Sequence, residues 1–175
     1  MAWKVKESGT MQIARRSEPW VTEAMLATYR QDLLPKYETT HGALMPILHD
    51  VQHTYGWIPE QAMEEIAAFL NISPSLVLDT VTFYEEYHTH PTGKCIIGVC
   101  QSIACEACGH QAVLDHVRTR LGIDPHETTA DGQFTLLAME CLGACDTAPC
   151  ALVNDDRHDN LSIADVDRII DEHTA

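Results

Sequence analysis

Basic residues are scarce in this chain of 175 residues, which has 11 Lys and Arg against 26 Asp and Glu. The formal net charge is −15, and the isoelectric point is about 4.8. Because a phosphate backbone repels such a surface, nucleic acid is excluded as the main partner. No apolar run approaches the ~18–20 residues that a bilayer requires, so we expect no membrane-spanning helix and no direct membrane insertion.

The first residues, MAWKVKESGT, lack the apolar core of a secretory signal. We therefore expect a soluble protein that stays in a reducing cytoplasm. Residues 1–16 hold four basic residues and one acid, whereas the rest of the chain is strongly acidic. The pattern predicts a flexible basic N-terminal extension. The alternative is an arm that becomes ordered on a partner subunit.

Cysteine is absent from the first 94 residues, and all seven cysteines lie between Cys95 and Cys150. An odd number in a chain of this kind indicates metal binding or redox chemistry more than a disulfide framework. The asymmetry divides the chain into a cysteine-free part and a part that carries the chemistry. A length of 175 residues allows one domain or two small ones.

Residues 17–90 follow helical spacing throughout, which predicts a small helical bundle. Pro19 is placed to open a first helix and Gly56 to end a second. A third helix is expected from Pro59, and the pair Ser73-Pro74 gives an N-cap and a first helical residue for a fourth.

Two histidines in this part, His49 and His53, have the i, i+4 spacing of a metal-binding pair. No third ligand and no HExxH pattern accompanies them. We interpret them as surface or packing histidines.

The periodicity changes after about residue 90 and predicts a compact α/β unit over residues 91–175. Strands are expected at 95–100, 133–139 and 151–154. A helix should run to about Leu121 and end at Gly122, residues 155–160 should form a turn, and a last helix should start at Ser162. The predicted fold class is thus α+β, a helical bundle followed by an α/β domain.

Two cysteine pairs follow predicted strands, Cys100 with Cys105 in a C-x4-C motif and Cys141 with Cys145 in a C-x3-C motif. Four thiolates that converge from two loops suit a [2Fe–2S] cluster, which four cysteine sulfurs normally hold. Gly143 permits a left-handed turn that directs amide N–H groups towards sulfur. The spacing favours an iron–sulfur site.

Two other kinds of site stay open at this point. Cys105 and Cys108 form a C-x-x-C motif at the start of a predicted helix, which is typical of a thiol–disulfide oxidoreductase. A structural zinc site is the third interpretation, although zinc knuckles most often have C-x2-C spacing. Cys95 is expected in the core and Cys150 beside the second pair as a packing residue.

Further motifs accompany the cysteine pairs within about residues 20–172. They are Leu44–His49, Tyr55–Pro59, Val81–Tyr84, Gly93-Lys94, Val99 with the C-x4-C motif, Glu140–Cys145, Ala148-Pro149 and Val153–Asp155. With these motifs the chain resembles the small [2Fe–2S] subunit of complex I, which is also called NADH–quinone oxidoreductase. This family includes homologous subunits of NAD-reducing hydrogenases and NAD-dependent formate dehydrogenases.

The resemblance implies a helical bundle followed by a thioredoxin-like [2Fe–2S] ferredoxin domain. It implies that Cys100, Cys105, Cys141 and Cys145 hold one [2Fe–2S] cluster. It also implies a partner flavoprotein subunit that binds NADH and FMN, while this chain carries electrons and has no substrate site of its own. The location that it implies is the cytoplasm, with peripheral attachment to the cytoplasmic face of the inner membrane as part of a complex as an alternative.

No dinucleotide-binding GxGxxG motif and no Walker motif occurs in the sequence, so we assign no nucleotide site to the chain. The helical bundle is expected to be a docking surface. Trp57 and Phe83 are candidate contacts, with ordinary core packing as the equal alternative.

Overall fold

The computed structural model describes residues 15–174, and the chain divides into two compact units, Met1–His90 and Pro91–Ala175. Each unit has its own hydrophobic core. Within the described residues, no helix is long and apolar enough to cross a membrane.

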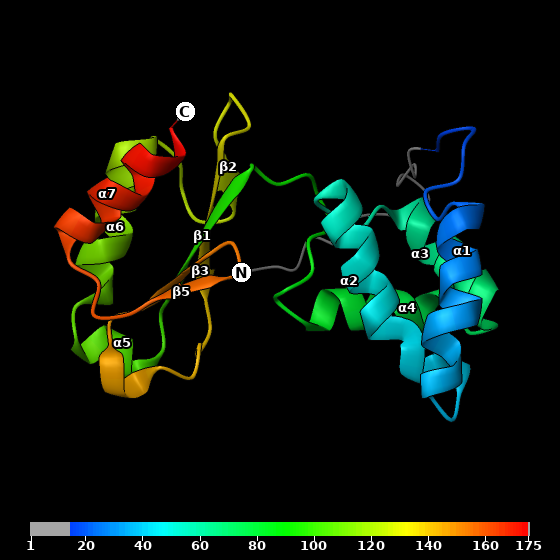
Figure 1. Cartoon of the computed structure of the whole chain (residues 1–175). Helices are drawn as coiled ribbons and strands as arrows, with labels where there is room; N and C mark the ends of the chain where they lie inside the picture. The colour runs from blue at the N-terminus through cyan, green and yellow to red at the C-terminus, as the bar shows by residue number, and fades with distance from the viewer. Residues whose placement is uncertain (1–14, 175) are drawn as a thin grey trace, which may run out of the picture. The chain divides into compact units, whose positions relative to one another are not determined.

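The first unit is helical (Figure 1). It contains α1 (Glu23–Thr28), α2 (Leu44–Tyr55), α3 (Glu60–Leu70) and α4 (Pro74–Phe83). Between α1 and α2 lie a π-helical turn, η2 (Tyr29–Leu33), and two 3-10 turns, η3 (Leu34–Lys36) and η4 (Thr40–Ala43). Its core is formed by buried apolar side chains from α2, α3 and α4 and from the flanks of the helices, among them Tyr29, Ile47, Leu48, Ile58, Ile66 and Val77, and α1 packs partly buried side chains against it.

Local sequence explains most of these helix ends. Gly56 adopts φ 80° after α2, and Ser73 caps α4 by accepting a hydrogen bond from the amide of Ser75. The expected opening of the first helix at Pro19 is wrong: Thr22 is the N-cap, and its hydroxyl accepts from the amide of Met25. The first amides of a helix have no partner within the helix, and the Thr22 hydroxyl accepts a hydrogen bond from one of them. Proline has no side-chain acceptor, so the helix begins at Glu23, four residues later than expected.

The base of the basic extension contacts this unit. The Arg16 guanidinium lies 3.6 Å from the ring centroid of Trp20, and the Arg16 amide donates to Gln61 at 3.0 Å. Arg15 pairs with Glu64 at 2.8 Å. The flexibility expected for residues 1–16 otherwise falls on residues 1–14, which lie outside the described residues.

The second unit is built on a five-stranded mixed sheet in the order β2-β3-β1-β4-β5. Its strands are β1 (Cys95–Cys100), β2 (Glu127–Thr128), β3 (Phe134–Met139), β4 (Ala151–Val153) and β5 (Asp156–His158). Central β1 pairs in parallel with β3 and antiparallel with β4. The helices are α5 (Ile103–Ala107), α6 (His110–Leu121) and α7 (Ile163–His173), with the 3-10 turn η5 (Cys145–Thr147).

The helices α6 and α7 lie side by side along the sheet (Figure 1). Their apolar side chains and those of β1, β3 and β4 form the second core. A capping box between Ser162 and Asp165 starts α7, as the sequence predicts.

Two expectations for this unit are corrected. The helix expected before Leu121 is broken in two, because Gly109 takes φ 89° between α5 and α6. The turn expected at 155–160 is in part the strand β5, which pairs with β4 in a hairpin around Asn154, at φ 52°.

Candidate metal centre

The first cysteine pair starts at the end of the central strand. Cys100 is the last residue of β1, and Cys105 lies on α5, which follows immediately. Both side chains are 2% exposed. The Cys100 amide donates to the carbonyl oxygen of Cys150 at 3.1 Å, which fixes the backbone at this point.

The second pair leaves the neighbouring strand at the same edge of the sheet. Cys100 is paired with Met139, the last residue of β3, so the loop that follows β3 begins beside the first cysteine. Cys141 and Cys145 lie in this loop with their sulfurs 3.8 Å apart, and both are exposed. Gly143 has φ 74°, and its amide donates to the Cys141 sulfur at 3.4 Å.

A hydrogen bond to sulfur joins the two loops. Burial by itself raises the pKa of the Cys100 thiol. The backbone amides of Leu142 and Ser102 and the neighbouring thiols donate hydrogen bonds to the Cys100 sulfur, and their combined effect lowers its pKa below the ordinary value. Leu142 belongs to the second loop, so this bond links the two pairs. The pKa of Cys145 is raised by its hydrogen bond with Cys141 and by the nearby sulfurs of Cys105 and Cys100.

Cys150 lies closer to the first pair than sequence reasoning anticipated. Its sulfur is 3.8 Å from that of Cys105, and the sulfurs of Cys100, Cys105 and Cys150 all lie within 4.8 Å of one another. Burial raises the pKa of the Cys150 thiol to about 12, with further contributions from Cys105 and Cys100. Cys150 stands beside Cys100 because β4, which starts at the next residue, pairs with β1.

The remaining cysteines have other surroundings. Cys95 is buried in the second core, as expected, and burial raises the pKa of its thiol to about 11. Cys108 is exposed at the C-terminal end of α5. The buried Cys105 sulfur lies with those of Cys100 and Cys150. The other cysteine of the C-x-x-C motif is at the surface.

The histidine pair of α2 shows packing contacts. The rings of His49 and His53 are 6.2 Å apart, and His49 lies 5.0 Å from the ring of Tyr87. Among residues 15–174, the one group of potential metal ligands that comes together consists of Cys100, Cys105 and Cys150.

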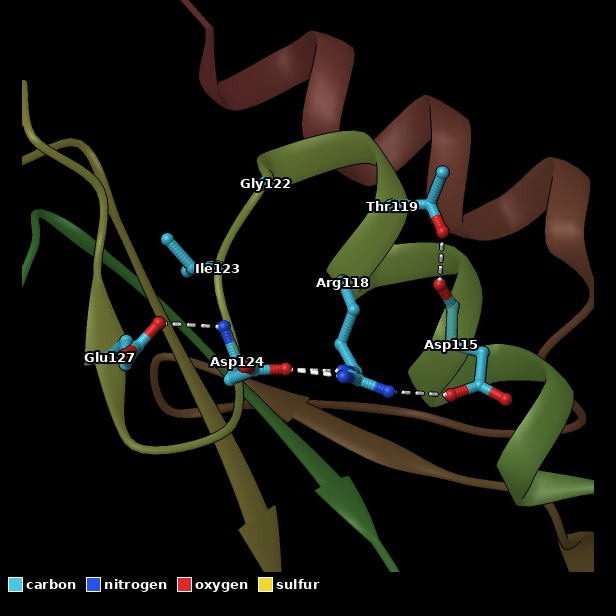
Figure 2. A pocket seen from close by; sticks show the side chains of 7 residues that line it. All are labelled: Asp115, Arg118, Thr119, Gly122, Ile123, Asp124 and Glu127. Carbon is cyan, nitrogen blue, oxygen red and sulfur yellow. Dashed lines mark hydrogen bonds and ion pairs between the residues drawn. The ribbon is translucent and has the colours of Figure 1, made fainter.

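A hollow of about 410 Å³ opens elsewhere in this unit, at the end of α6 (Figure 2). Arg118 extends from α6 between two carboxylates, with Asp115 at 3.1 Å and Asp124 on its other side. Glu127 accepts a hydrogen bond from the Asp124 amide at 2.8 Å. These side chains pair with one another and tie α6 to the loop that follows it.

The cysteine loops fit an iron–sulfur cluster by the chemistry of their donors. They offer soft sulfur ligands from two segments, and amides point at several of these sulfurs: Gly143 at Cys141, Leu142 at Cys100 and Cys150 at Cys105. One pair is buried and the other is exposed, so a group held between them would lie near the surface.

Comparison with known proteins agrees with this fit. Residues 30–174 match the family model "Thioredoxin-like [2Fe-2S] ferredoxin", and the chain belongs to this family. Together with the cysteine group, the family assigns one [2Fe–2S] cluster as the cofactor.

The chain is also similar in sequence to named subunits of NADH-quinone oxidoreductases. The chain is 40% identical over 140 residues to an NADH-quinone oxidoreductase subunit of Rhizobium meliloti, covering 80% of this chain and 83% of the relative. It is 38% identical over 137 residues to the corresponding subunit of Pseudomonas aeruginosa, covering 78% and 82%. The match to NADH-quinone oxidoreductase subunit 2 of Thermus thermophilus is 38% over 130 residues, covering 73% and 72%.

A solved structure shares the fold. An NAD+-reducing [NiFe]-hydrogenase in the H2-reduced state superposes with a TM-score of 0.67 at 26% identity, over 78% of this chain. The match spans only 23% of the hydrogenase chain, so it concerns one part of that larger protein.

Proposed function

We propose that this chain is the electron-transfer subunit of an NADH dehydrogenase of the complex I type, with a cluster held by Cys100, Cys105, Cys141 and Cys145. The observation that carries the proposal is the convergence of the two cysteine loops at one edge of the sheet, where the Leu142 amide of one loop donates to the Cys100 sulfur of the other. The identity to NADH-quinone oxidoreductase subunits over most of both chains supports the parent complex.

When bound, a [2Fe–2S] cluster takes up and releases one electron at a time. The chain's own residues fix where this happens. The buried Cys100 and Cys105 anchor the site to β1 and α5, and the exposed Cys141 and Cys145 bring it to the surface. Amide donors to the sulfurs stabilise negative charge there.

The partner we propose is a flavoprotein subunit that binds NADH and whose FMN exchanges electrons with the cluster.

The domain division that goes with this proposal has three parts: residues 1–16 form a basic extension, 17–90 a helical docking unit and 91–175 the cluster unit. Exposed aromatic rings support a docking role for the helical unit: Phe83 is 78% exposed and Tyr84 43%. Trp57 instead packs edge-on against Trp20, with ring centroids 5.8 Å apart. A cytoplasmic location, peripheral on the inner membrane through the complex, belongs to the same proposal.

Anaerobic purification followed by iron and acid-labile sulfide analysis tests the ligand set. Two iron and two sulfide per chain, with an EPR signal after one-electron reduction, are expected. Cys141→Ser should abolish cluster assembly, whereas the matched exposed substitution Cys108→Ser should leave it intact. Loss of the cluster in Cys108→Ser, or a colourless protein that holds zinc and no sulfide, contradicts the proposal.

A second candidate is a subunit of an NAD-reducing hydrogenase, favoured by the structural match to one part of such an enzyme. A subunit of an NAD-dependent formate dehydrogenase is a further alternative of the same class. Purification of the chain with its native partners separates these candidates, since a quinone-reducing activity supports the first and hydrogen- or formate-dependent NAD reduction supports the others. The thiol–disulfide oxidoreductase alternative predicts disulfide reduction that Cys108→Ser abolishes.

A further inference from the structure

The proposed cluster leaves Cys95, Cys108 and Cys150 without a role, and of these three Cys150 alone belongs to a buried group with Cys100 and Cys105. It is 1% exposed, as deeply buried as Cys100 and Cys105, and it belongs to the same small cluster of buried residues. Three thiols thus face one another in a buried place, while the proposed ligand set uses two of them.

The spacing of the three sulfurs fits one metal ion. Metal–sulfur bonds of about 2.3 Å place three sulfurs about 4 Å apart around a central ion. The sulfurs of Cys105 and Cys150 are 3.8 Å apart, and all three lie within 4.8 Å of one another. Small side-chain rotations therefore suffice to close a trigonal site.

The backbone holds Cys150 in position for this role. Its carbonyl oxygen accepts from the Cys100 amide at 3.1 Å, and its own amide donates to the Cys105 sulfur. The pairing of β4 with β1 begins at the next residue and keeps this arrangement in register. The third thiol is therefore fixed beside the first two.

We propose that Cys100, Cys105 and Cys150 form a three-thiolate site that binds one Cu(I) ion when the [2Fe–2S] cluster is absent. Soft thiolates select Cu(I), Zn(II) and iron–sulfur clusters. Zn(II) is almost always four-coordinate in structural sites, and no fourth Cys, His, Asp or Glu joins the group in the part of the chain that the structure describes. Three buried sulfurs therefore suit Cu(I) better. The thiols release their protons to solvent on binding, and the metal keeps its oxidation state.

The site rests on the proposed function in one respect, because the cluster and Cu(I) would share Cys100 and Cys105. They should therefore exclude each other. Copper bound first should prevent iron and sulfide from entering, and Cys150 is the residue that makes the apo protein sensitive to copper.

The test uses the full chain, freed of iron with a chelator, kept anaerobic and reduced with a phosphine. Cu(I) is supplied as its bicinchoninate complex, whose absorbance reports how much metal the protein withdraws. One tightly bound Cu(I) per chain is expected, and Cys150→Ala should bind it at least about tenfold more weakly, because losing even a group that only orients a ligand typically weakens metal binding by about 10- to 100-fold.

Three comparisons make the assignment specific. Cys95→Ala removes an equally buried cysteine outside the group and should bind Cu(I) like the wild type. The double variant Cys141→Ser/Cys145→Ser removes the exposed pair and should also retain tight binding. X-ray absorption of the wild-type complex should show three sulfurs around copper, a measurement that needs no variant.

Undiminished binding in Cys150→Ala, loss of binding in the double variant, or a two-sulfur copper spectrum would overturn the site. Cluster assembly is assayed separately by iron and sulfide content, and Cys150→Ala should assemble it normally. A protein that assembles no cluster but binds Cu(I) therefore contradicts the proposed function alone, and the reverse result contradicts the copper site alone.

Discussion

The backbone of Phe134 passes so close to Gly93 that a β-carbon at position 93 would lie 2.7 Å from the Phe134 carbonyl carbon. The Gly93 amide also donates to the Thr135 hydroxyl at 2.7 Å, which holds the chain against β3 as it enters the second unit. The neighbouring atoms are backbone and cannot rotate away.

Gly93→Ala should lower the free energy of unfolding of this unit by about 1–3 kcal/mol, because overpacking against a rigid neighbour forces the backbone to shift. Denaturant titration followed by circular dichroism measures the change. Lys94→Ala alters the next, exposed residue and should stay within about 0.5 kcal/mol of the wild type. Equal stabilities of the two variants would show that the close approach costs nothing.

Substitutions at Gly143 should reduce cluster retention in graded order. The left-handed backbone at φ 74° costs a residue with a β-carbon about 1–2 kcal/mol, although open space surrounds the position. Gly143→Asn should keep most of the iron, since Asn tolerates this conformation, and Gly143→Val should lose more. The measurement is iron per chain after incubation with a chelator, and equal loss in both variants would assign the effect to bulk.

Acid should weaken the contact between α6 and α7 through Asp167. The hydrogen bond from His116 at 2.8 Å, together with the charges of His116 and Arg120, lowers the pKa of Asp167 below its ordinary value of 3.8. A carboxyl group whose folded pKa is depressed adds stability above its unfolded pKa and loses it as the pH falls through the folded pKa.

Asp167→Asn should therefore flatten the fall in stability below about pH 3.8. Denaturant midpoints at a series of acid pH values measure this slope. Asp155→Asn, an exposed aspartate in the β4–β5 hairpin, is the control and should retain the wild-type slope. An unchanged slope in Asp167→Asn would remove Asp167 from the acid response.

Arg16 should stabilise the helical unit through its contact with Trp20. Cation–π contacts at exposed sites contribute about 0.5–1 kcal/mol, and Arg16 also donates to the carbonyl oxygens of Glu18 and Pro19. Arg16→Ala should lower the free energy of unfolding by about 1 kcal/mol. Unfolding followed by tryptophan fluorescence measures it, with the exposed Lys36→Ala as a control that should change little.

Local signals predicted the parts of the fold that depend on neighbouring residues. Ser73-Pro74, Gly56 and the Ser162–Asp165 pair fix helix ends by hydrogen bonds within a few residues. Short runs of strand-forming residues were enough to predict β1 and β3. Once β1 and β3 are parallel neighbours, the C-x4-C and C-x3-C loops must meet at one edge. The family and its cofactor were predicted correctly from these motifs.

Long-range pairing could not be predicted in the same way. The position of Cys150 depends on β4 lying antiparallel to β1, a contact between segments about fifty residues apart that no local pattern encodes. The strand β5 was missed because residues 155–160 are rich in Asp and Asn, which are typical of turns, yet part of this segment pairs with β4. The break at Gly109 looked like a helix interior because one glycine is tolerated there.

The exposure of Cys108 has a practical consequence. Of the seven cysteines, four are buried, and two of the three exposed ones are proposed cluster ligands. A thiol-reactive label on the cluster-loaded protein should therefore attach at one place, on the α5 side of the electron-transfer site. No residue need be engineered to follow how a partner approaches that site.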